Sequence, residues 1–244
     1  MTTALEWQLA TVTAIRSETA KVKSFTFSLP AWRPHRAGQH YDIRLTAEDG
    51  YRAQRSYSIA SEPERAGELD LTIEQVEGGE VSAFMHDTVA MGDRIEVRGP
   101  IGGYFVWEAA LGGPLLLIAG GSGIVPLMSM LRHRTASGST APARLLYSSR
   151  SYDDIIYRDE LERITGNGLE VFHTLTRSQP AGWTGFARRI DTRMLSEVSQ
   201  VYGAKALTFI CGPTPLVESA ANGLLELGLK SERIKTERFG PSGT

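Results

Sequence analysis

The segment from Arg55 to Ser61 brings a cation, an aromatic ring and several hydroxyls together, in the order Arg-Ser-Tyr-Ser-Ile-Ala-Ser. The ring of Tyr57 can stack on a flat cofactor, and a hydroxyl beside it, from Ser56 or Ser58, can hydrogen-bond to a ring nitrogen. The guanidinium of Arg55 can pair with a phosphate in a fork geometry. The alternative is a strand with one polar face and a surface arginine.

A second candidate for phosphate binding is Gly79-Glu80-Val81-Ser82, which opens a predicted helix from about Ser82 to Val89. The amides of Gly79 to Val81 would lie at the helix start, where free N–H groups and the helix dipole attract anions. Gly79 permits close backbone approach, and Ser82 supplies a hydroxyl. A hairpin turn followed by an ordinary N-cap is the alternative, and for this segment alone it is favoured.

Gly120, Gly121 and Gly123 belong to the segment Gly-Gly-Ser-Gly-Ile-Val-Pro, which ends at Pro126 and directly follows the apolar run Leu115 to Ala119. A strand, a glycine loop and a helix in this order can cradle phosphates on backbone N–H groups. The loop lacks the G-x-G-x-x-G spacing of simple dinucleotide folds and the lysine of nucleotide-hydrolase loops. It therefore indicates phosphate binding only together with its strand and helix.

Cys211-Gly212-Pro213 follows the predicted strand residues Ala206 to Ile210. Ligands bind at the carboxyl ends of strands in open α/β sheets, so the thiol of Cys211 is a candidate for contact with a ligand. The alternative is a buried structural cysteine followed by a turn, which is the commoner role of a lone cysteine.

The first half of the chain must position the earlier motifs, and it reads as short strands separated by glycine turns, with one helix. Its predicted strands are Leu9–Ile15, Val22–Leu29, Tyr41–Leu45, Leu69–Ile73 and Arg94–Arg98. Short strands at this spacing predict a small antiparallel β-barrel.

The second half alternates strands with helices, which predicts a doubly wound parallel sheet. Its predicted strands are Leu115–Ala119, Arg144–Ser148, Leu169–Leu175 and Ala206–Cys211, with helices around Met128–His133, Glu160–Glu162 and Pro215–Leu227. We place the boundary within Ala109–Pro114 and expect a barrel domain over residues 1–110 and an α/β domain over residues 111–244.

Composition limits the class of protein and its partners. The chain has 244 residues, 41% apolar residues and a net charge of −2, so neither nucleic acid nor an anionic membrane is an expected partner. The single cysteine, Cys211, cannot form an internal disulfide or hold an iron–sulfur cluster alone. The five histidines show no spacing typical of metal ligands, so we assign no metal. No signal-peptide pattern or membrane-spanning apolar run occurs, and we expect a cytoplasmic protein.

Taken in order, these motifs resemble those of the ferredoxin–NADP⁺ reductase superfamily, from about Thr11 to Gly240. The family's flavin signature, R-x-Y-S-x-x-S, is matched in full. The family's pyrophosphate motif has a counterpart at Gly79–Ser82, and its barrel-closing pattern has one at Gly92–Phe105. Its nucleotide loop corresponds to Gly120–Pro126, its C-G pair to Cys211–Gly212 and its acidic-x-aromatic ending to Glu237–Gly240.

The resemblance implies that FAD binds to the first half of the chain. Arg55 would pair with the flavin pyrophosphate, and Tyr57 would lie along one face of the isoalloxazine. Ser58 would hydrogen-bond near the N5 atom, which accepts hydride. Ser82 and the amides of Gly79–Val81 would complete the phosphate site.

The resemblance also implies that a nicotinamide nucleotide binds to the second half. The glycine loop from Gly120 to Gly123 would let its phosphates lie close to the backbone, and Cys211 would approach the nicotinamide beside its reactive carbon. In the ending that contains Glu237, Phe239 would stack on the flavin face opposite Tyr57. The nicotinamide would then reach the flavin only when Phe239 moves.

The charges after two predicted strands favour NADPH over NADH. An NAD-preferring fold commonly places an acidic residue near the end of its second strand. Here Ser149 and Arg150 follow one strand and Arg177 follows the next, which suits an additional 2′-phosphate. Arg158 is a further candidate. The alternative is that the arginines are solvated loop charges, close to the acidic pair Asp153-Asp154.

The implied function is hydride transfer from NADPH to FAD, followed by transfer of single electrons to an acceptor protein. Family members with their own iron–sulfur domain carry a four-cysteine motif, which this chain lacks. The acceptor is therefore expected to be separate: a ferredoxin, a flavodoxin or an oxygenase component. The first alternative is the reductase component of an oxygenase system, with NADH or NADPH as the donor. The second alternative is a flavin-binding regulatory subunit without turnover.

Overall fold

The computed structural model describes residues 5–239, and its contacts divide the chain into two compact units. The first unit runs to Glu108 and also includes Met128–Ala136. The second unit takes Ala109–Leu127 and the chain from Ser137 onward. The change of unit after Glu108 lies close to the boundary that composition and pattern predict at residues 110–111.

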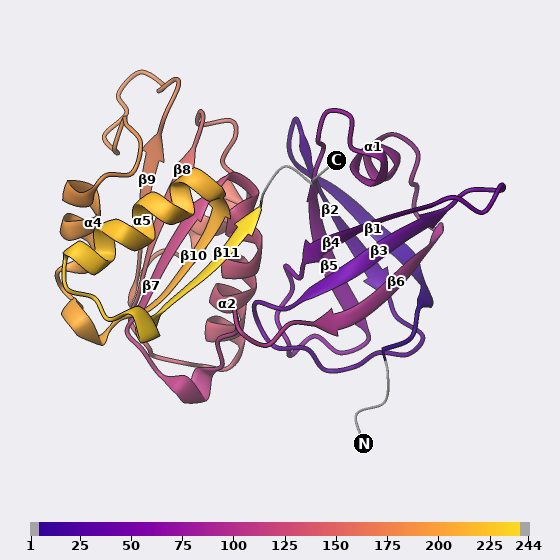
Figure 1. The fold of residues 1–244 in the computed structure, drawn as a ribbon, viewed down its shortest axis with the longest axis horizontal. Coiled ribbons are helices and arrows are strands. Elements are labelled where there is room, and N and C mark those ends of the chain that lie inside the picture. Colours follow the sequence, from indigo (N-terminus) through magenta and orange to yellow (C-terminus); the bar gives the residue numbers. More distant parts are fainter. Residues whose placement is uncertain (1–4, 240–244) are drawn as a thin grey trace. The chain divides into compact units, whose positions relative to one another are not determined.

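The part of the first unit that runs to Glu108 contains six antiparallel strands and one helix (Figure 1). They are β1 (Gln8–Thr19), β2 (Val22–Ser28), β3 (His40–Thr46), β4 (Arg52–Ser58), β5 (Glu68–Glu74), α1 (Glu80–Asp87) and β6 (Arg94–Ile101). The strand order is β4-β3-β6-β1-β2-β5, and a bridge between Ile59 and Leu71 links the ends of the sheet. The sheet therefore curls around its core, as a barrel requires.

The interior of this barrel is filled by side chains that alternate along the strands. Phe25 and Phe27 on β2, and Leu71 and Ile73 on β5, are fully buried in one cluster. This alternation, apolar inward and polar outward, is what the sequence pattern of the first half predicts. The antiparallel barrel is confirmed.

The second unit contains a parallel sheet of five strands in the order β11-β10-β7-β8-β9 (Figure 1). Its elements, with helix α2 extending into the first unit, are β7 (Leu115–Gly120), α2 (Ile124–Ala136), β8 (Ala143–Ser149), α3 (Arg158–Ile164), β9 (Leu169–Leu175), α4 (Thr192–Ser199), β10 (Leu207–Pro213), α5 (Thr214–Glu226) and β11 (Ile234–Phe239). Strands alternate with helices, so the doubly wound α/β class is confirmed.

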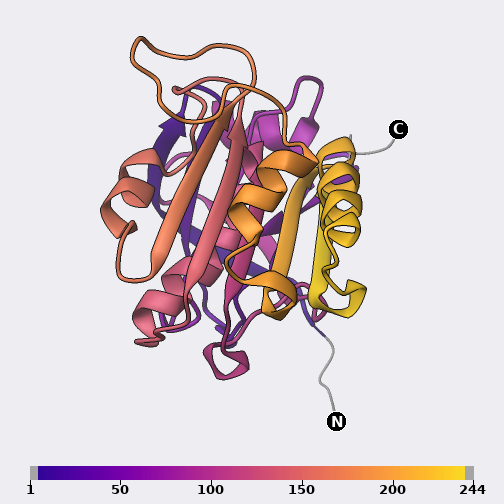
Figure 2. The same cartoon turned by 90° about the vertical axis from the view of Figure 1, so that its left-hand side faces the viewer.

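The two faces of the parallel sheet carry different side chains. Leu116, Ile118 and Ile210 point to one face, where they pack against residues of α4 and α5. Figure 2 shows these two helices in front of that face. Because side chains alternate along a strand, Cys211 points to the other face, which we call the cysteine face.

Two elements of the second unit have no counterpart among the predicted ones. The helix α4 (Thr192–Ser199) begins with Asp191 as its N-cap, whose carboxylate accepts a hydrogen bond from the Met194 N–H. The strand β11 (Ile234–Phe239) pairs in parallel with β10 and forms the edge of the sheet. Among helices within residues 5–239, none is long and apolar enough to cross a lipid bilayer.

Candidate functional site

The strand β4 presents Arg55 and Tyr57 on one face and Ser56 on the other. Arg55 is exposed, and its guanidinium donates from Nη1 to the Gln54 carbonyl oxygen at 2.6 Å. Tyr57 packs against the barrel core, and burial raises its pKa to about 12. Ser56 instead donates to Oδ1 of Asp42 at 2.6 Å. Its side chain therefore does not join the candidate site that the sequence predicts for it.

Ser58 ends β4 as a buried residue, and its hydroxyl has no hydrogen-bond partner within residues 5–239. The antiparallel register places His40 of β3 directly opposite Ser58. Desolvation by burial lowers the pKa of His40, so the imidazole is neutral at pH 7. Sequence reasoning missed His40 because only the register of two strands brings it to Ser58.

The start of α1 has the glycine that a phosphate site needs. Gly79 is the N-cap and offers no side-chain acceptor to the first helical N–H groups. A Cβ on Gly79 would lie 2.6 Å from Oγ of Ser82, so the backbone packs tightly there. The Ser82 hydroxyl donates to the Gly79 carbonyl and accepts from the Val76 N–H, both at 3.1 Å. Val81 is buried, and its side chain belongs to the barrel core.

These observations fit a flat cofactor with a diphosphate. Tyr57 offers a ring, Ser58 an uncommitted hydroxyl, and Arg55 a cation with no carboxylate partner among the described residues. The amides at the start of α1 add a positive partial charge. The acidic side chain of Glu80, in the first turn of that helix, accepts a hydrogen bond from the Tyr51 hydroxyl.

On the parallel sheet, a row of register partners crosses the cysteine face near the carboxyl ends of the strands. Cys211 of β10 pairs with Glu237 of β11 on one side and with Ala119 of β7 on the other. The row continues through Tyr147 of β8 to His173 of β9. In-register parallel neighbours point to the same side, so the thiol of Cys211 and the carboxyl of Glu237 are adjacent.

Burial shifts the pKa of both members of that pair in the same direction. Desolvation raises the pKa of the Cys211 thiol well above its ordinary value, and the charge of Glu237 adds to the rise. Desolvation raises the pKa of Glu237 to about 7. The thiol is therefore protonated at neutral pH, while the carboxyl of Glu237 gains or loses its charge at a pH of about 7.

The glycine loop lies against the end of β10 because one glycine in the loop and one in β10 lack a side chain. A Cβ on Gly123 would lie 2.2 Å from the Cys211 carbonyl oxygen, and one on Gly212 would lie 3.0 Å from the backbone of Gly120. Gly121 has a φ of +53°, and a Cβ there would meet nothing within 4 Å. The loop thus leaves open space beside its backbone for a phosphate.

Prolines occur at the first turns of the two helices that follow these strand ends. Pro126 is the third residue of α2, which begins at Ile124. Pro213 ends β10 and is the N-cap of α5. A proline is tolerated at both positions because neither N–H would have an intrahelical partner.

Arg150 and Arg177 lie together at the ends of β8 and β9. The Arg177 N–H donates to the Arg150 carbonyl oxygen at 2.8 Å, and both residues are exposed. Ser149 precedes Arg150, and its buried hydroxyl has no hydrogen-bond partner in the described part of the chain. Arg158 is engaged elsewhere, because its guanidinium lies 3.4 Å from Asp159 and stacks over the ring of Tyr152.

The final strand places Phe239 opposite Pro213 of β10, two residues beyond the Cys211–Glu237 pair. Its side chain is half-buried. Gly240, the last residue of the predicted ending, lies outside the described residues.

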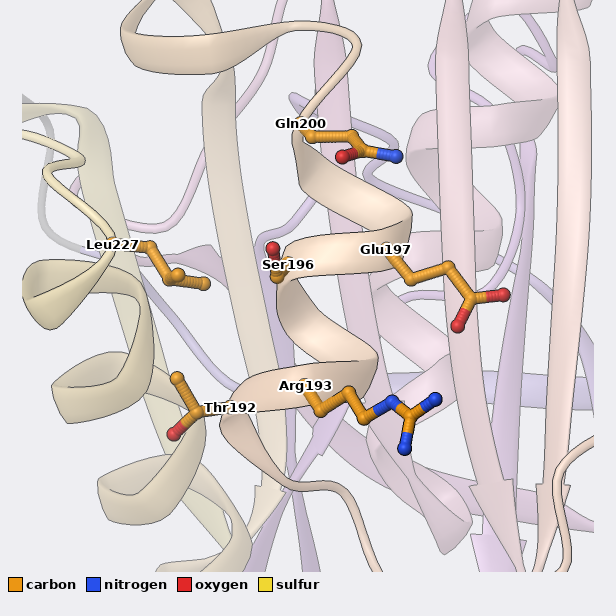
Figure 3. A pocket seen from close by; sticks show the side chains of 6 residues that line it. All are labelled: Thr192, Arg193, Ser196, Glu197, Gln200 and Leu227. Carbon is orange, nitrogen blue, oxygen red and sulfur yellow. The ribbon is translucent and has the colours of Figure 1, made fainter.

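One pocket lies away from all predicted site residues. It has a volume of about 440 Å³ and opens on the outer side of α4 (Figure 3). Its lining residues are Thr192, Arg193, Ser196, Glu197, Gln200 and Leu227. Because α4 covers the face opposite Cys211, this pocket is not part of the candidate site. In residues 5–239, no three His, Cys, Asp or Glu side chains come together as a metal site.

Two protein families match the two units in turn. The family described as oxidoreductase FAD-binding domain matches residues 9–106, and the family described as oxidoreductase NAD-binding domain matches residues 117–222. The predicted order, a flavin domain followed by a nucleotide domain, is confirmed.

Curated relatives fall into two groups by name and length. Ferredoxin–NADP reductase B of Sorangium cellulosum is 32% identical over 231 residues, which cover 91% of this chain and 89% of that protein. The glycine betaine monooxygenase reductase subunit of Pseudomonas aeruginosa is 31% identical over 231 residues, covering 92% of this chain but 62% of that protein. The chain thus spans about three-fifths of the length of the oxygenase reductase subunits it matches.

Solved structures share the fold. A ferredoxin–NADP⁺ reductase from Neisseria gonorrhoeae, solved with bound FAD and NADP, has a TM-score of 0.82 at 21% identity, covering 95% of this chain and 98% of that one. The cytochrome b5 reductase domain of Ulva prolifera nitrate reductase has a TM-score of 0.83 at 23% identity, covering 95% of this chain and 97% of that one.

Proposed function

The chain belongs to the ferredoxin–NADP⁺ reductase superfamily, and on this premise we propose that it is a flavoprotein reductase. Acting in the cytoplasm, it moves a hydride from NADPH to FAD and then passes single electrons to a separate carrier protein. One hydride carries two electrons, so each NADPH reduces two one-electron acceptors. Bound FAD supplies the redox chemistry, taking up an electron pair and releasing its electrons singly.

The first unit holds and orients the flavin. Tyr57 lies along one face of the ring system, and Ser58 donates its otherwise uncommitted hydroxyl near the N5 atom. Arg55 and the amides at the start of α1 pair with the diphosphate. His40 is the register partner of Ser58 and is neutral at pH 7, so it places no charge beside that hydroxyl.

The second unit holds the nicotinamide nucleotide. The open backbone at Gly121 receives the diphosphate, and Arg150 and Arg177 bind the 2′-phosphate. Cys211 and Glu237 line the place of the nicotinamide, with a neutral thiol beside a carboxyl that titrates near pH 7. A protonated thiol packs against the nicotinamide without attacking it as a nucleophile.

The observation that carries the proposal is that one chain contains both a candidate flavin site and a candidate nicotinamide site. The candidate flavin site is the free Ser58 hydroxyl beside Tyr57 and Arg55. The candidate nicotinamide site is the Cys211–Glu237 pair beside the glycine loop. A flavin-binding subunit without turnover does not require a site for the nicotinamide.

A ferredoxin or flavodoxin is the proposed acceptor. The relative that the chain matches over 89% of its length is a ferredoxin–NADP reductase, which supports this choice. The second candidate function is the reductase component of an oxygenase, favoured by relatives named as reductase parts of glycine betaine, propane and phenol monooxygenases.

The test is reduction of a one-electron carrier by the FAD-loaded protein. NADPH is added together with a ferredoxin, then with a flavodoxin, and the absorbance of the carrier is followed. The proposal predicts NADPH-dependent reduction of at least one carrier, with a carrier-only control inactive. Reduction of neither, with rapid electron transfer to an oxygenase component instead, would favour the second candidate function.

A further inference from the structure

Tyr51 is an exposed aromatic residue directly before β4. The residue is 57% exposed, and its hydroxyl donates to the two carboxylate oxygens of Glu80 at 3.2 Å and 3.0 Å. Glu80 is the first residue of α1. This hydrogen bond holds the ring of Tyr51 beside the start of that helix, where the diphosphate is proposed to bind.

Tyr51 directly precedes β4, and the Ala47 N–H donates to its carbonyl oxygen at 2.9 Å, so the pairing of the β3–β4 hairpin continues to Tyr51. Side chains two positions apart point to the same face, so Tyr51, Arg55 and Tyr57 form one row. Ala53, between Tyr51 and Arg55, is small and buried in the barrel core, so no large side chain separates the two residues on that face. The hydrogen bond to Glu80 raises the pKa of Tyr51, and the nearby charge of Arg55 opposes that rise.

The order of this row corresponds to the order of the parts of FAD. The flavin ring is proposed to lie at Tyr57 and the diphosphate at Arg55, so the adenosine must continue beyond Arg55. On the face of Arg55, the next large side chain in that direction is that of Tyr51, directly before β4. A tyrosine supplies a large flat surface with few rotatable bonds, which suits stacking on a base.

We propose that Tyr51 stacks on the adenine of FAD and thereby sets the preference of this chain for FAD over FMN. The inference rests on the proposed function, since it assumes a flavin on β4. FMN ends at its single phosphate and gains nothing from Tyr51. Glu80 acts as a positioning residue, because its carboxylate holds the phenol hydroxyl at the edge of the diphosphate site.

The experiment compares FAD and FMN affinity in the full chain freed of flavin, by quenching of flavin fluorescence. Stacking of one base on one aromatic side chain contributes about 5- to 150-fold in affinity. Tyr51→Ala should therefore weaken FAD binding at least about fivefold and leave FMN binding unchanged. Tyr51→Phe keeps the ring and should lose less affinity. Met91→Ala is the control, because Met91 is 70% exposed on the turn before β6.

Two results would overturn the inference alone. They are an unchanged preference for FAD in Tyr51→Ala, and an equal loss of FAD and FMN affinity, which would indicate general damage to the barrel. A wild-type chain that binds no FAD, or prefers FMN, would overturn the inference together with the flavin assignment of the proposed function. The two kinds of failure are thus distinguished by the wild-type titration.

Discussion

Cys211 and Glu237 are register partners on the adjacent parallel strands β10 and β11, so a buried thiol and a carboxyl stand side by side on the cysteine face. No positive charge is among the interactions that shift the pKa of either group, and only the backbone hydrogen bond of Gly212 lowers the pKa of the thiol. Burial is therefore the main cause of the raised pKa of both groups.

The Cys211 thiol should resist alkylation in the folded protein. It is fully buried, and burial together with the charge of Glu237 raises its pKa, so little thiolate forms at pH 8. Labelling by iodoacetamide, followed by mass spectrometry, should be more than about tenfold slower in buffer than in denaturant, where the thiol is exposed. Equal rates in the two conditions would show that the thiol is accessible.

Glu237→Gln should stabilise the protein at alkaline pH. The pKa of the folded carboxyl, about 7, lies above its ordinary value of 4.5, so folding favours the protonated form. Its favourable contribution is fully present below about pH 4.5 and is lost as the pH rises through 7. We expect a gain of about 1–2 kcal/mol at pH 8, since one pKa unit corresponds to about 1.4 kcal/mol and the group keeps some solvent contact.

Thermal unfolding of wild type and Glu237→Gln, at pH 5 and pH 8 without nucleotide, checks this expectation. The increase in Tm should be clear at pH 8 and small at pH 5. An equal increase at both values would mean that the substitution acts through packing and not through the charge.

The sequence predicts the fold class and much of the site because the relevant patterns are local. Leu169–Leu175 is predicted as a strand and is β9, and the strand–glycine loop–helix segment at Gly120 is found in place. Arg150 and Arg177 are predicted at one edge of the sheet from strand ends alone, and their backbones are hydrogen-bonded. Parallel strands align their carboxyl ends, so this inference needs no register.

Other features depend on contacts that a local pattern does not contain. The strand β11 is short and polar, and only its pairing with β10 makes it a strand and sets Glu237 beside Cys211. His40 likewise reaches Ser58 only through the β3–β4 register. Ser56 is the opposite case: the period of two already separates its side chain from those of Arg55 and Tyr57, and its hydroxyl bonds to Asp42.

Arg150→Ala should reduce the preference for NADPH. One charge-assisted contact to the 2′-phosphate contributes about 1.5–3 kcal/mol, or about 10- to 150-fold. The ratio of kcat/KM for NADPH to that for NADH should fall by this factor in Arg150→Ala, and similarly in Arg177→Ala. Arg193→Ala is a matched control, because Arg193 is an exposed arginine on the outer side of α4 (Figure 3).

Two outcomes would contradict this assignment. Equal or better use of NADH by the wild type would remove NADPH as the preferred donor. A ratio that changes as much in Arg193→Ala as in Arg150→Ala would mean that overall charge, and not a local contact, determines the preference.

Phe239→Ala should tighten the binding of nicotinamide nucleotides, NADH included. If Phe239 stacks on the flavin, the nicotinamide reaches its place only in the fraction of molecules in which the ring has moved, and this fraction lowers the apparent affinity. Titration with NADP⁺ and NAD⁺, monitored by difference absorbance, should give a several-fold lower Kd for both, with slower turnover through delayed release. Weaker binding of both would contradict the stacking role.

Anaerobic rapid mixing of the FAD-loaded protein with NADPH or NADH, in the absence of any acceptor, tests the central claim most directly. The account predicts that NADPH bleaches the flavin absorbance within the time of one turnover and faster than NADH does. It also predicts that a ferredoxin or flavodoxin added afterwards restores the absorbance by removing electrons one at a time. A flavin that stays oxidised with both nucleotides would contradict the account.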